Sequence, residues 1–459
     1  AETQEEMLAI VASCVKESPD AAYIRGTGWS WSIFIGSSPH KDALDAIDST
    51  RPIILGDSDG HTLWGNSAAM ALAGITVDTP QPEGGEIGLD DNGELDGTLL
   101  ETAMDMLESK LPVLTLQQKE DGLRYSQNYL HGLGITSIQD AYVRLLGEGA
   151  DKSLDAYKSL QDKGELNLRV VAALYWEPGI GMSQIDGMVA ARQNFSKGRL
   201  QATSIKFWAD GILESHTAKM LEPYSDKPDS NGLLMIPREE IMEAVPALDA
   251  LGFQIHVHAI GDATVRYALD AFEAAQKANG KRDSRHLTAH TQLVDEADLN
   301  RFAELDAIAG FSPYWANADS YVAEINPAQI GPERMKRMYL MKSILDSGAR
   351  IAFGSDWYVT TADPLLGIET AVTRLDPEDA PTPEFLPAER LSLDQAIAGY
   401  TTGAAHANFL DKDTGTVEVG KYADLVVLTD NLFEVPAEQI SNARVTATIM
   451  EGELVFGEL

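Results

Sequence analysis

The chain has 459 residues and carries 71 acidic against 35 basic residues, a formal net charge of −36. This acidic excess argues against nucleic acid or an anionic membrane as a partner. The single cysteine, Cys14, excludes an intrachain disulfide, and no run approaches the roughly 18 apolar residues of a membrane span. With 44% hydrophobic residues the chain can bury a large core.

The N-terminal residues predict a helix and show no signal-peptide pattern. In the run TQEEMLAIVASCVKES, Thr3 and Glu6 have the spacing of a capping box. Cys14 falls within this run and is expected to be a buried, unreactive thiol. We therefore expect a cytoplasmic protein, with an exported form left open because the sequence begins directly on a helix, as the interior of a longer chain does.

Residues 20–112 show no regular alternation of strands and helices. They contain short strands and a predicted hairpin around Asp91–Gly93. Between residues 56 and 75, a loop rich in glycine and aspartate brings His61 and Trp64 to the start of a helix. This loop either lines a pocket or only turns the chain, and the sequence leaves both readings open.

From about residue 113, short apolar runs alternate with helical runs, which predicts consecutive βα units. Near-continuous apolar runs are typical of parallel strands buried on both faces. A closed (β/α)8 barrel needs eight strands, one more than these runs supply, so either the fold is not a closed barrel or one strand lies outside this sequence. The tail after residue 408 predicts a small antiparallel unit. The runs predict seven parallel strands: Gly134–Asp140, Leu168–Trp176, Ser204–Asp210, Phe253–His258, His286–Thr291, Ala307–Ser312 and Arg350–Asp356.

Four polar side chains lie near the ends of separate predicted strands: Lys206, His258, His290 and Asp356. The carboxyl ends of parallel strands meet at one barrel mouth, so these side chains are expected to converge. Histidine and aspartate are good ligands for zinc and similar ions. A buried lysine has a lowered pKa, and its neutral amine can add carbon dioxide to form a metal-bridging carbamate. The alternatives are histidines bonded to the backbone and an ion pair between Lys206 and Asp210.

His256 lies two residues before His258, so the two share one face of the strand. We expect His256 to point into the barrel one layer deeper, outside any ligand shell.

Several segments together resemble a known enzyme family. The stretches GDSDGHTLWGNSAAM, IKFWADGILESHTA, HVHAIGDATV, LTAHTQLV and FGSDW are similar to those of the amidohydrolase superfamily, in particular its amidohydrolase-3 (YtcJ-like) group. The resemblance implies an α/β fold, a (β/α)8 TIM barrel of the metal-dependent hydrolase type with a small flanking β-sandwich. It places the barrel at residues 1–19 and 113–408, an insertion subdomain at 20–112 between barrel strands 1 and 2, and part of the sandwich at 409–459.

The resemblance also implies a site with one or two divalent ions, with zinc the first candidate. Lys206 matches the carbamylated lysine of strand 4, His258 and His290 match the ligands of strands 5 and 6, and Asp356 matches the ligand of strand 8. In the family, the first barrel strand ends in a His-x-His pair, and no such pair precedes residue 256. We interpret the missing eighth strand and the missing pair as one absence, and expect an N-terminally incomplete chain.

The expected function is metal-dependent hydrolysis of amide-type, non-peptide C–N bonds in a small molecule. Metal-activated water attacks the carbonyl, and Asp356 takes the proton and passes it to the leaving amine. We expect His61, Trp64 and the loop around His216 to shape the substrate pocket, and a homodimer is compatible with the sequence. Ester or lactone hydrolysis and deamination stay open, as does a non-catalytic binding or regulatory barrel without the complete metal shell.

Overall fold

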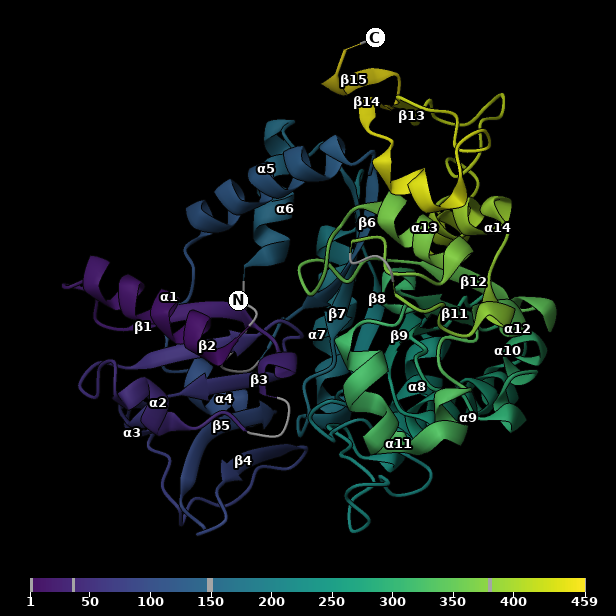
Figure 1. Ribbon diagram of the computed structural model, residues 1–459. Helices are drawn as coiled ribbons and strands as arrows, with labels where there is room; N and C mark the ends of the chain where they lie inside the picture. Colours follow the sequence, from purple (N-terminus) through teal and green to yellow (C-terminus); the bar gives the residue numbers. More distant parts are fainter. Residues whose placement is uncertain (1–2, 35–37, 147–151, 379–381, 459) are drawn as a thin grey trace.

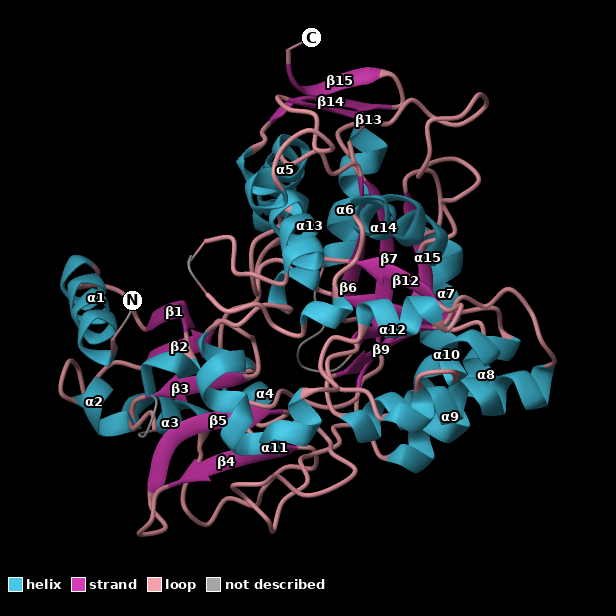
Figure 2. Cartoon of the chain, turned by 45° about the vertical axis from the view of Figure 1, so that its right-hand side comes forward, coloured by secondary structure: helices cyan, strands magenta, loops and turns pink. Residues whose placement is uncertain are grey.

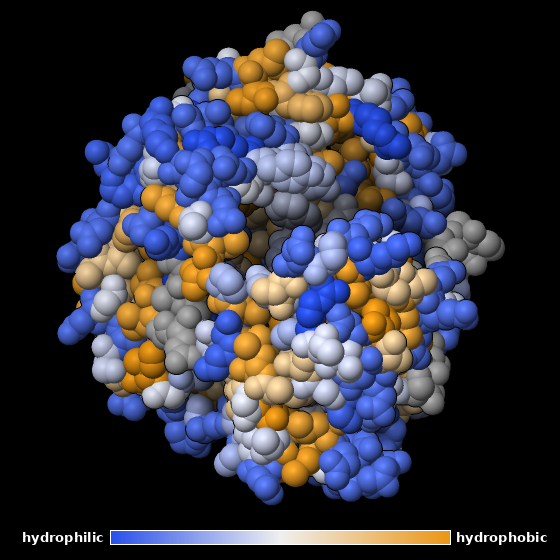
Figure 3. Space-filling view, turned by 90° about the vertical axis from the view of Figure 1, so that its left-hand side faces the viewer, coloured by the Kyte–Doolittle hydropathy of each residue, from blue (hydrophilic) through white to orange (hydrophobic). Residues whose placement is uncertain are grey.

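The computed structural model describes residues 3–34, 38–146, 152–378 and 382–458. It contains a mixed N-terminal sheet, a seven-stranded parallel sheet and a small C-terminal sheet (Figure 1). Helices lie around the outside of the parallel sheet (Figure 2). Across the described residues, no helix combines the length and apolarity needed to cross a bilayer. The face shown in Figure 3 mixes hydrophilic and apolar residues and is hollowed near its centre.

The N-terminal sheet has the strand order β1-β2-β3-β5-β4, with β1 and β2 parallel and the other pairs antiparallel. The hairpin of β4 and β5 turns at Gly93, whose φ of 80° suits glycine, and this confirms the predicted hairpin. The elements are α1 (Gln4–Glu17), β1 (Ile24–Trp29), α2 (Lys41–Asp45), β2 (Ile53–Asp57), β3 (Thr62–Gly65), α3 (Ser67–Ala73), β4 (Gly85–Leu89), β5 (Leu95–Glu101) and α4 (Met104–Glu108).

Helix α1 packs on this N-terminal sheet, whereas the sequence grouped residues 1–19 with the barrel. Its buried residues Met7 and Val11 belong to the same apolar cluster as Ile24 and Trp29. The predicted cap is present, since Thr3 Oγ1 accepts a hydrogen bond from the backbone N–H of Glu6 at 3.2 Å. The prediction of a buried thiol at position 14 was wrong: the cysteine is exposed, because α1 buries only those two side chains.

The central sheet confirms the seven predicted parallel strands, in the order β12-β11-β10-β9-β8-β7-β6. The first begins at Ser137, three residues later than predicted, because Gly134 (φ 81°) still closes the turn after α5. The strands are β6 (Ser137–Val143), β7 (Arg169–Tyr175), β8 (Leu200–Trp208), β9 (Gln254–Ala259), β10 (Leu287–His290), β11 (Ile308–Phe311) and β12 (Arg350–Phe353).

Every residue of β7 and β9 is buried. The apolar residues of both strands suit this burial, and the polar residues of β9, Gln254, His256 and His258, are buried with hydrogen-bond partners. The helices of this part are α5 (Leu116–Gly132), α6 (Ser153–Lys163), α7 (Ile185–Phe195), α8 (Arg238–Ala250), α9 (Asp262–Asn279), α10 (Arg301–Glu304), α11 (Asn326–Met335), α12 (Met341–Asp346), α13 (Pro364–Thr373), α14 (Leu393–Ala398) and α15 (Ala404–Ala407).

Side-chain contacts show that the parallel sheet is curled. Strands β6 and β9 are separated by β7 and β8, which in a flat sheet would hold them about 14 Å apart. Nevertheless Gln139 Oε1 of β6 lies 2.6 Å from His256 Nδ1, and Gln139 Nε2 lies 3.2 Å from Gln254 Oε1, both on β9. The concave face therefore encloses these side chains. Within the described residues β6 and β12 do not pair, so the sheet is open between them.

The C-terminal strands β13 (Leu425–Leu428), β14 (Val445–Met450) and β15 (Glu453–Gly457) form an antiparallel sheet at the top of Figure 1. Arg169 at the start of β7 pairs with Asp424 and Glu451 of this unit. Thr448 Oγ1 also donates a hydrogen bond of 2.6 Å to the carbonyl of His131 in α5. These buried polar contacts fix the small sheet against the start of the parallel one.

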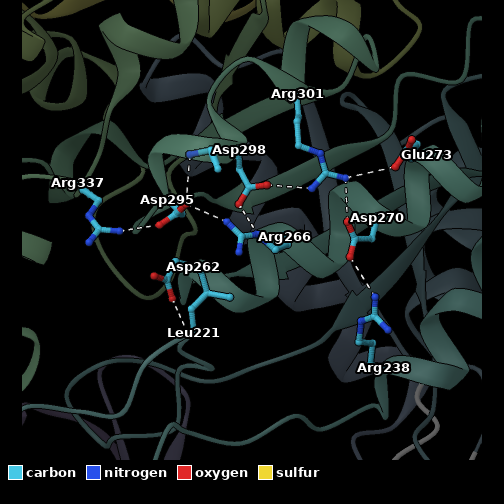
Figure 4. A network of polar contacts seen from close by, with 11 residues as sticks. Leu221, Arg238, Asp262, Arg266, Asp270, Glu273, Asp295, Asp298, Arg301 and Arg337 are labelled. Atoms are coloured by element: carbon cyan, nitrogen blue, oxygen red, sulfur yellow. Dashed lines mark hydrogen bonds and ion pairs between the residues drawn. The ribbon is translucent and has the colours of Figure 1, made fainter.

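A network of ion pairs fixes the segment that follows β10 against α9 (Figure 4). Arg266 of α9 binds Asp295 at 2.8 Å and Asp298 at 2.9 Å. Arg301 of α10 binds Asp298 at 2.9 Å and Asp270 at 2.8 Å. Networks of this kind add more stability than isolated surface pairs, and this one holds in place the connection that leaves β10.

Candidate active site

The structure brings together the four polar side chains at the strand ends. Lys206, His258 and His290 lie on β8, β9 and β10 and are buried, whereas Asp356 follows β12 by three residues and is exposed. The ring centroids of His258 and His290 are 4.7 Å apart. Asp356 lies close enough to Lys206 and His290 for its charge to oppose the effect of burial on both pKa values.

Burial disfavours the charged form of the basic members of this group. It lowers the pKa of Lys206 to about 8 and that of His290 to about 4. The pKa of His258 falls well below its usual value, because of burial first and the neighbouring His290 second. Metal ligands must be deprotonated to bind, so the neutral His258 and His290 are suited to hold a cation. Lys206 is still mostly protonated below about pH 8, but it loses its proton more readily than an ordinary lysine.

A buried carboxylate orients His258. Asp210 Oδ1 lies 3.1 Å from His258 Nδ1 and also accepts from the backbone N–H of Ile260, while Oδ2 accepts from Gly261 and Lys219. Carboxylates that bind the second nitrogen of a histidine are typical of metal sites. The sequence reasoning considered Asp210 only as an ion-pair partner for Lys206; within the described ranges, Lys206 makes no ion pair. The position of Asp210, two residues after β8 and beside the strand of His258, was the sequence signal that could have indicated this role.

His256 occupies the interior of the curled sheet. Besides its contact with Gln139, its Nε2 lies 3.4 Å from Lys206 Nζ. Burial and the nearby lysine lower its pKa well below the usual value. His256 is therefore an uncharged neighbour of Lys206 inside the curled sheet.

Of the three residues expected to shape the pocket, only His61 lines it. His61 comes from the N-terminal subdomain, and its ring lies 5.2 Å from that of His258 between centroids. Trp64 is fully buried among apolar residues of the N-terminal sheet, because its place on β3 turns it away from the loop. His216 is bound to Asp226 at 3.0 Å and packs on Tyr224, outside the cavity lining. Trp64 and His216 themselves therefore do not line this cavity, although Glu214 of the loop around His216 does.

His61 is held as a cation by a carboxylate that the sequence reasoning missed. Its Nδ1 lies 2.9 Å from Glu101 Oε2, and Thr217 Oγ1 donates to Glu101 Oε1 at 2.6 Å. Burial alone would lower the pKa of His61, but Glu101, Asp57 and Asp59 raise it to about 9. Glu101 ends β5 far from the barrel in sequence, and no motif marks it.

A cavity of about 100 Å³ opens beside His61, His258 and Asp356. His290 does not line it but stacks on Trp315, which does, with ring centroids 5.1 Å apart. The wall also carries aromatic rings and three more carboxylates. The arrangement places a cationic imidazole, uncharged histidines and carboxylates around a space for a small molecule.

The carboxylate of Glu214 in this cavity predicts a pH-dependent change in stability. Burial, with the nearby charges of Asp59 and Asp319, raises its pKa to about 7. Between about pH 4.5 and 7 the unfolded chain ionises this group first, so rising pH destabilises the folded protein. The variant Glu214→Gln does not titrate there. Its melting temperature minus that of the wild type should rise from pH 4.5 to 7 and then level off, by the equivalent of about 1–3 kcal/mol.

Thermal unfolding of both proteins across this pH range measures the difference, in which the contributions of titrating groups that do not interact with Glu214 cancel. A difference in melting temperature that stays constant from pH 4.5 to 8 would contradict the assignment of a raised pKa to Glu214.

Comparison with known proteins identifies the family. A model of the amidohydrolase family matches residues 1–456. The chain belongs to this family. Protein LONG AFTER FAR-RED 3 of Arabidopsis thaliana is 30% identical to it over 461 residues, 99% of this chain and 77% of that protein. N-substituted formamide deformylase of Arthrobacter pascens is 24% identical over 469 residues, 99% of this chain and 82% of that protein.

Among solved structures, an uncharacterized metal-dependent hydrolase from Pyrococcus furiosus aligns with a TM-score of 0.65 and 28% identity, over 92% of this chain and 80% of that one. As an amidohydrolase-family member with this architecture, the protein is a hydrolase. The family assignment confirms the resemblance that the sequence motifs indicated.

Proposed function

We propose that this amidohydrolase cleaves amide-type, non-peptide C–N bonds with a divalent ion held by Lys206, His258, His290 and Asp356. The observation that carries the proposal is the approach of these four side chains from the ends of four parallel strands. The names of the relatives support the reaction type, since one is a formamide deformylase and another a metal-dependent hydrolase. The curled sheet fits an α/β barrel, and the C-terminal sheet fits its flanking sandwich.

The chemical kinds of the donor atoms support the proposal of a divalent ion. Within the described residues, Nδ1 of His290 is buried without a hydrogen-bond partner. His258 uses Nδ1 to bind Asp210, which leaves Nε2 for a ligand bond. No group of three His, Cys, Asp or Glu side chains in the described ranges is arranged to hold a metal. The proposal therefore requires Lys206 as a further ligand and a closer approach of the four side chains when the ion binds. Its neutral amine can add carbon dioxide with loss of one proton, and the carbamate supplies anionic oxygen. Zinc suits such nitrogen and oxygen ligands.

When bound, the ion supplies an acidified water and polarises the substrate carbonyl. Asp356 accepts the proton of the attacking water and returns it to the leaving amine, which departs neutral. His61, kept cationic by Glu101, places positive charge where the carbonyl oxygen becomes negative. Asp210 holds His258 in a single tautomer throughout.

Metal content and activity test this proposal together. Elemental analysis should find about one equivalent of zinc or a similar ion per chain, and assays should detect hydrolysis of N-substituted formamides. His290→Asn should lower the metal content; asparagine tolerates the left-handed backbone (φ 69°) at this position.

His286→Asn is the matched control, because His286 precedes the same strand and is equally buried, yet binds Asp249 away from the site. Equal metal content in the two variants, or a wild-type protein that binds no metal and cleaves no amide, would refute the proposal.

A further inference from the structure

The cavity wall carries three carboxylates that the proposed reaction does not use. Asp59 comes from the loop between β2 and β3, Glu214 from the loop after β8, and Asp319 from the segment after β11. All three side chains are partly exposed. Burial raises the pKa of each, and the charge of Asp59 adds to the rise at Glu214 and Asp319.

In the described part of the chain, no lysine or arginine pairs with any of the three. Asp59 accepts hydrogen bonds from the hydroxyls of Ser58 and Tyr321 at 3.1 and 3.2 Å. Asp319 accepts from the backbone N–H of Val322 at 2.9 Å. The nearby cation His61 already pairs with Glu101. The carboxylates of the wall therefore carry negative charge that neutral hydrogen-bond donors only partly stabilise. Burying such charge costs folding free energy unless a cation pairs with it.

A second observation points to a ligand with donors. Asn326 lines the same cavity, is fully buried, and donates from Nδ2 to Glu214 Oε1 at 2.8 Å. This bond fixes the orientation of the amide, and the remaining oxygen, Oδ1, is a buried acceptor without a partner in the described residues. The carboxylates and this amide oxygen all accept hydrogen bonds, so the wall is built for a group that donates several.

A metal ion is the weaker candidate for this wall. No three carboxylates or imidazoles within the described ranges stand close enough together to hold one ion. The aromatic rings of Tyr314, Trp315, Tyr321 and Tyr339 also line the cavity. Aromatic faces bind organic cations, ammonium and guanidinium groups among them. Dispersed acceptors together with aromatic rings fit an organic cation better than a chelated metal.

We propose that the substrate carries a protonated amino or guanidinium group, which Asp59, Glu214, Asp319 and Asn326 bind while the scissile amide lies beside His258 and Asp356. This inference rests on the proposed C–N hydrolysis and names the class of substrate for it. Because the cation pairs with otherwise uncompensated carboxylates, a neutral substrate of the same shape should bind poorly.

Two formamides of nearly equal shape test the inference: N-(4-aminobutyl)formamide, and N-pentylformamide, in which a methyl group replaces the ammonium. At pH 8, kcat/KM should be at least about tenfold higher for the cationic substrate, since a buried charge pair is typically worth more than one factor of ten. Glu214→Gln and Asp319→Asn should each lower this ratio several-fold. Glu222→Gln makes the same charge change on an exposed side chain outside the cavity and should leave the ratio unchanged.

A binding measurement separates this inference from the proposed reaction. By isothermal titration calorimetry, 1,4-diaminobutane should bind more tightly than neutral 1,4-butanediol, and Glu214→Gln should reduce the difference several-fold. If this holds while neither formamide is cleaved, the proposed reaction fails and the cation-binding wall stands. A substrate ratio near one, or a ratio unchanged by Glu214→Gln, overturns the inference. So does Mg²⁺ binding to the wild type that Glu214→Gln abolishes, which would make the wall a metal site.

Discussion

Asp356→Asn is expected to remove most turnover, by about 10²–10⁴-fold, while the protein stays folded. Asparagine keeps the size of the side chain but cannot carry the proton from the attacking water to the leaving amine. Position 356 has a left-handed backbone (φ 55°), which asparagine adopts nearly as readily as aspartate. The aspartate side chain is also exposed, so its replacement buries no unpaired group.

The measurements are kcat for an N-substituted formamide and the melting temperature of both proteins. Asp229→Asn is the control, because Asp229 is exposed, lies outside the cavity lining and loses the same charge. Turnover by Asp356→Asn within about twofold of the wild type would exclude Asp356 as the proton carrier. A large fall in melting temperature would instead mean that the carboxylate supports the fold.

The parallel sheet could be predicted from the sequence because each of its strands separately shows the apolar pattern that burial on both faces requires. A strand covered on both faces must be apolar over most of its length, as β7 is between Val170 and Leu174. The ends of these strands then fix where Lys206, His258 and His290 stand. The packing of α1 could not be predicted, because its narrow apolar stripe of Met7 and Val11 would fit any apolar face.

The residues that approach the site from other parts of the chain were harder to predict. His61 could be predicted as a pocket residue because it lies in a glycine-rich loop. The same argument also predicted Trp64, but the side chain of Trp64 on β3 points into the core. Glu101 comes from a segment without a recognisable motif. Glu214 lies in the stretch IKFWADGILESHTA but was not singled out there, and only the fold brings the two to the cavity region. Their chemistry depends on burial and on neighbours distant in sequence, which a single sequence does not specify.

Asp210→Asn is expected to weaken metal binding about 10–100-fold, the usual effect of losing the carboxylate behind a histidine ligand. The two oxygens of Asp210 accept from four donors, three of them backbone N–H groups. An asparagine has one acceptor oxygen, so whichever way its amide turns, two of these donors lose their partner. Loss of the negative charge also weakens the bond to His258 Nδ1, and stability should fall by about 2–4 kcal/mol.

Asp249→Asn separates the effect on metal binding from the effect on the fold. Asp249 is 3% exposed and lies 3.1 Å from His286 Nε2, so it is also a buried aspartate bound to a buried histidine, but outside the cavity. Both variants should lose stability, whereas only Asp210→Asn should lose metal affinity in competition with a chelator. Equal metal affinity in the two variants would show that Asp210 supports only the loop after β9. A selective loss in Asp210→Asn would show that His258 binds the ion through the nitrogen that Asp210 leaves free.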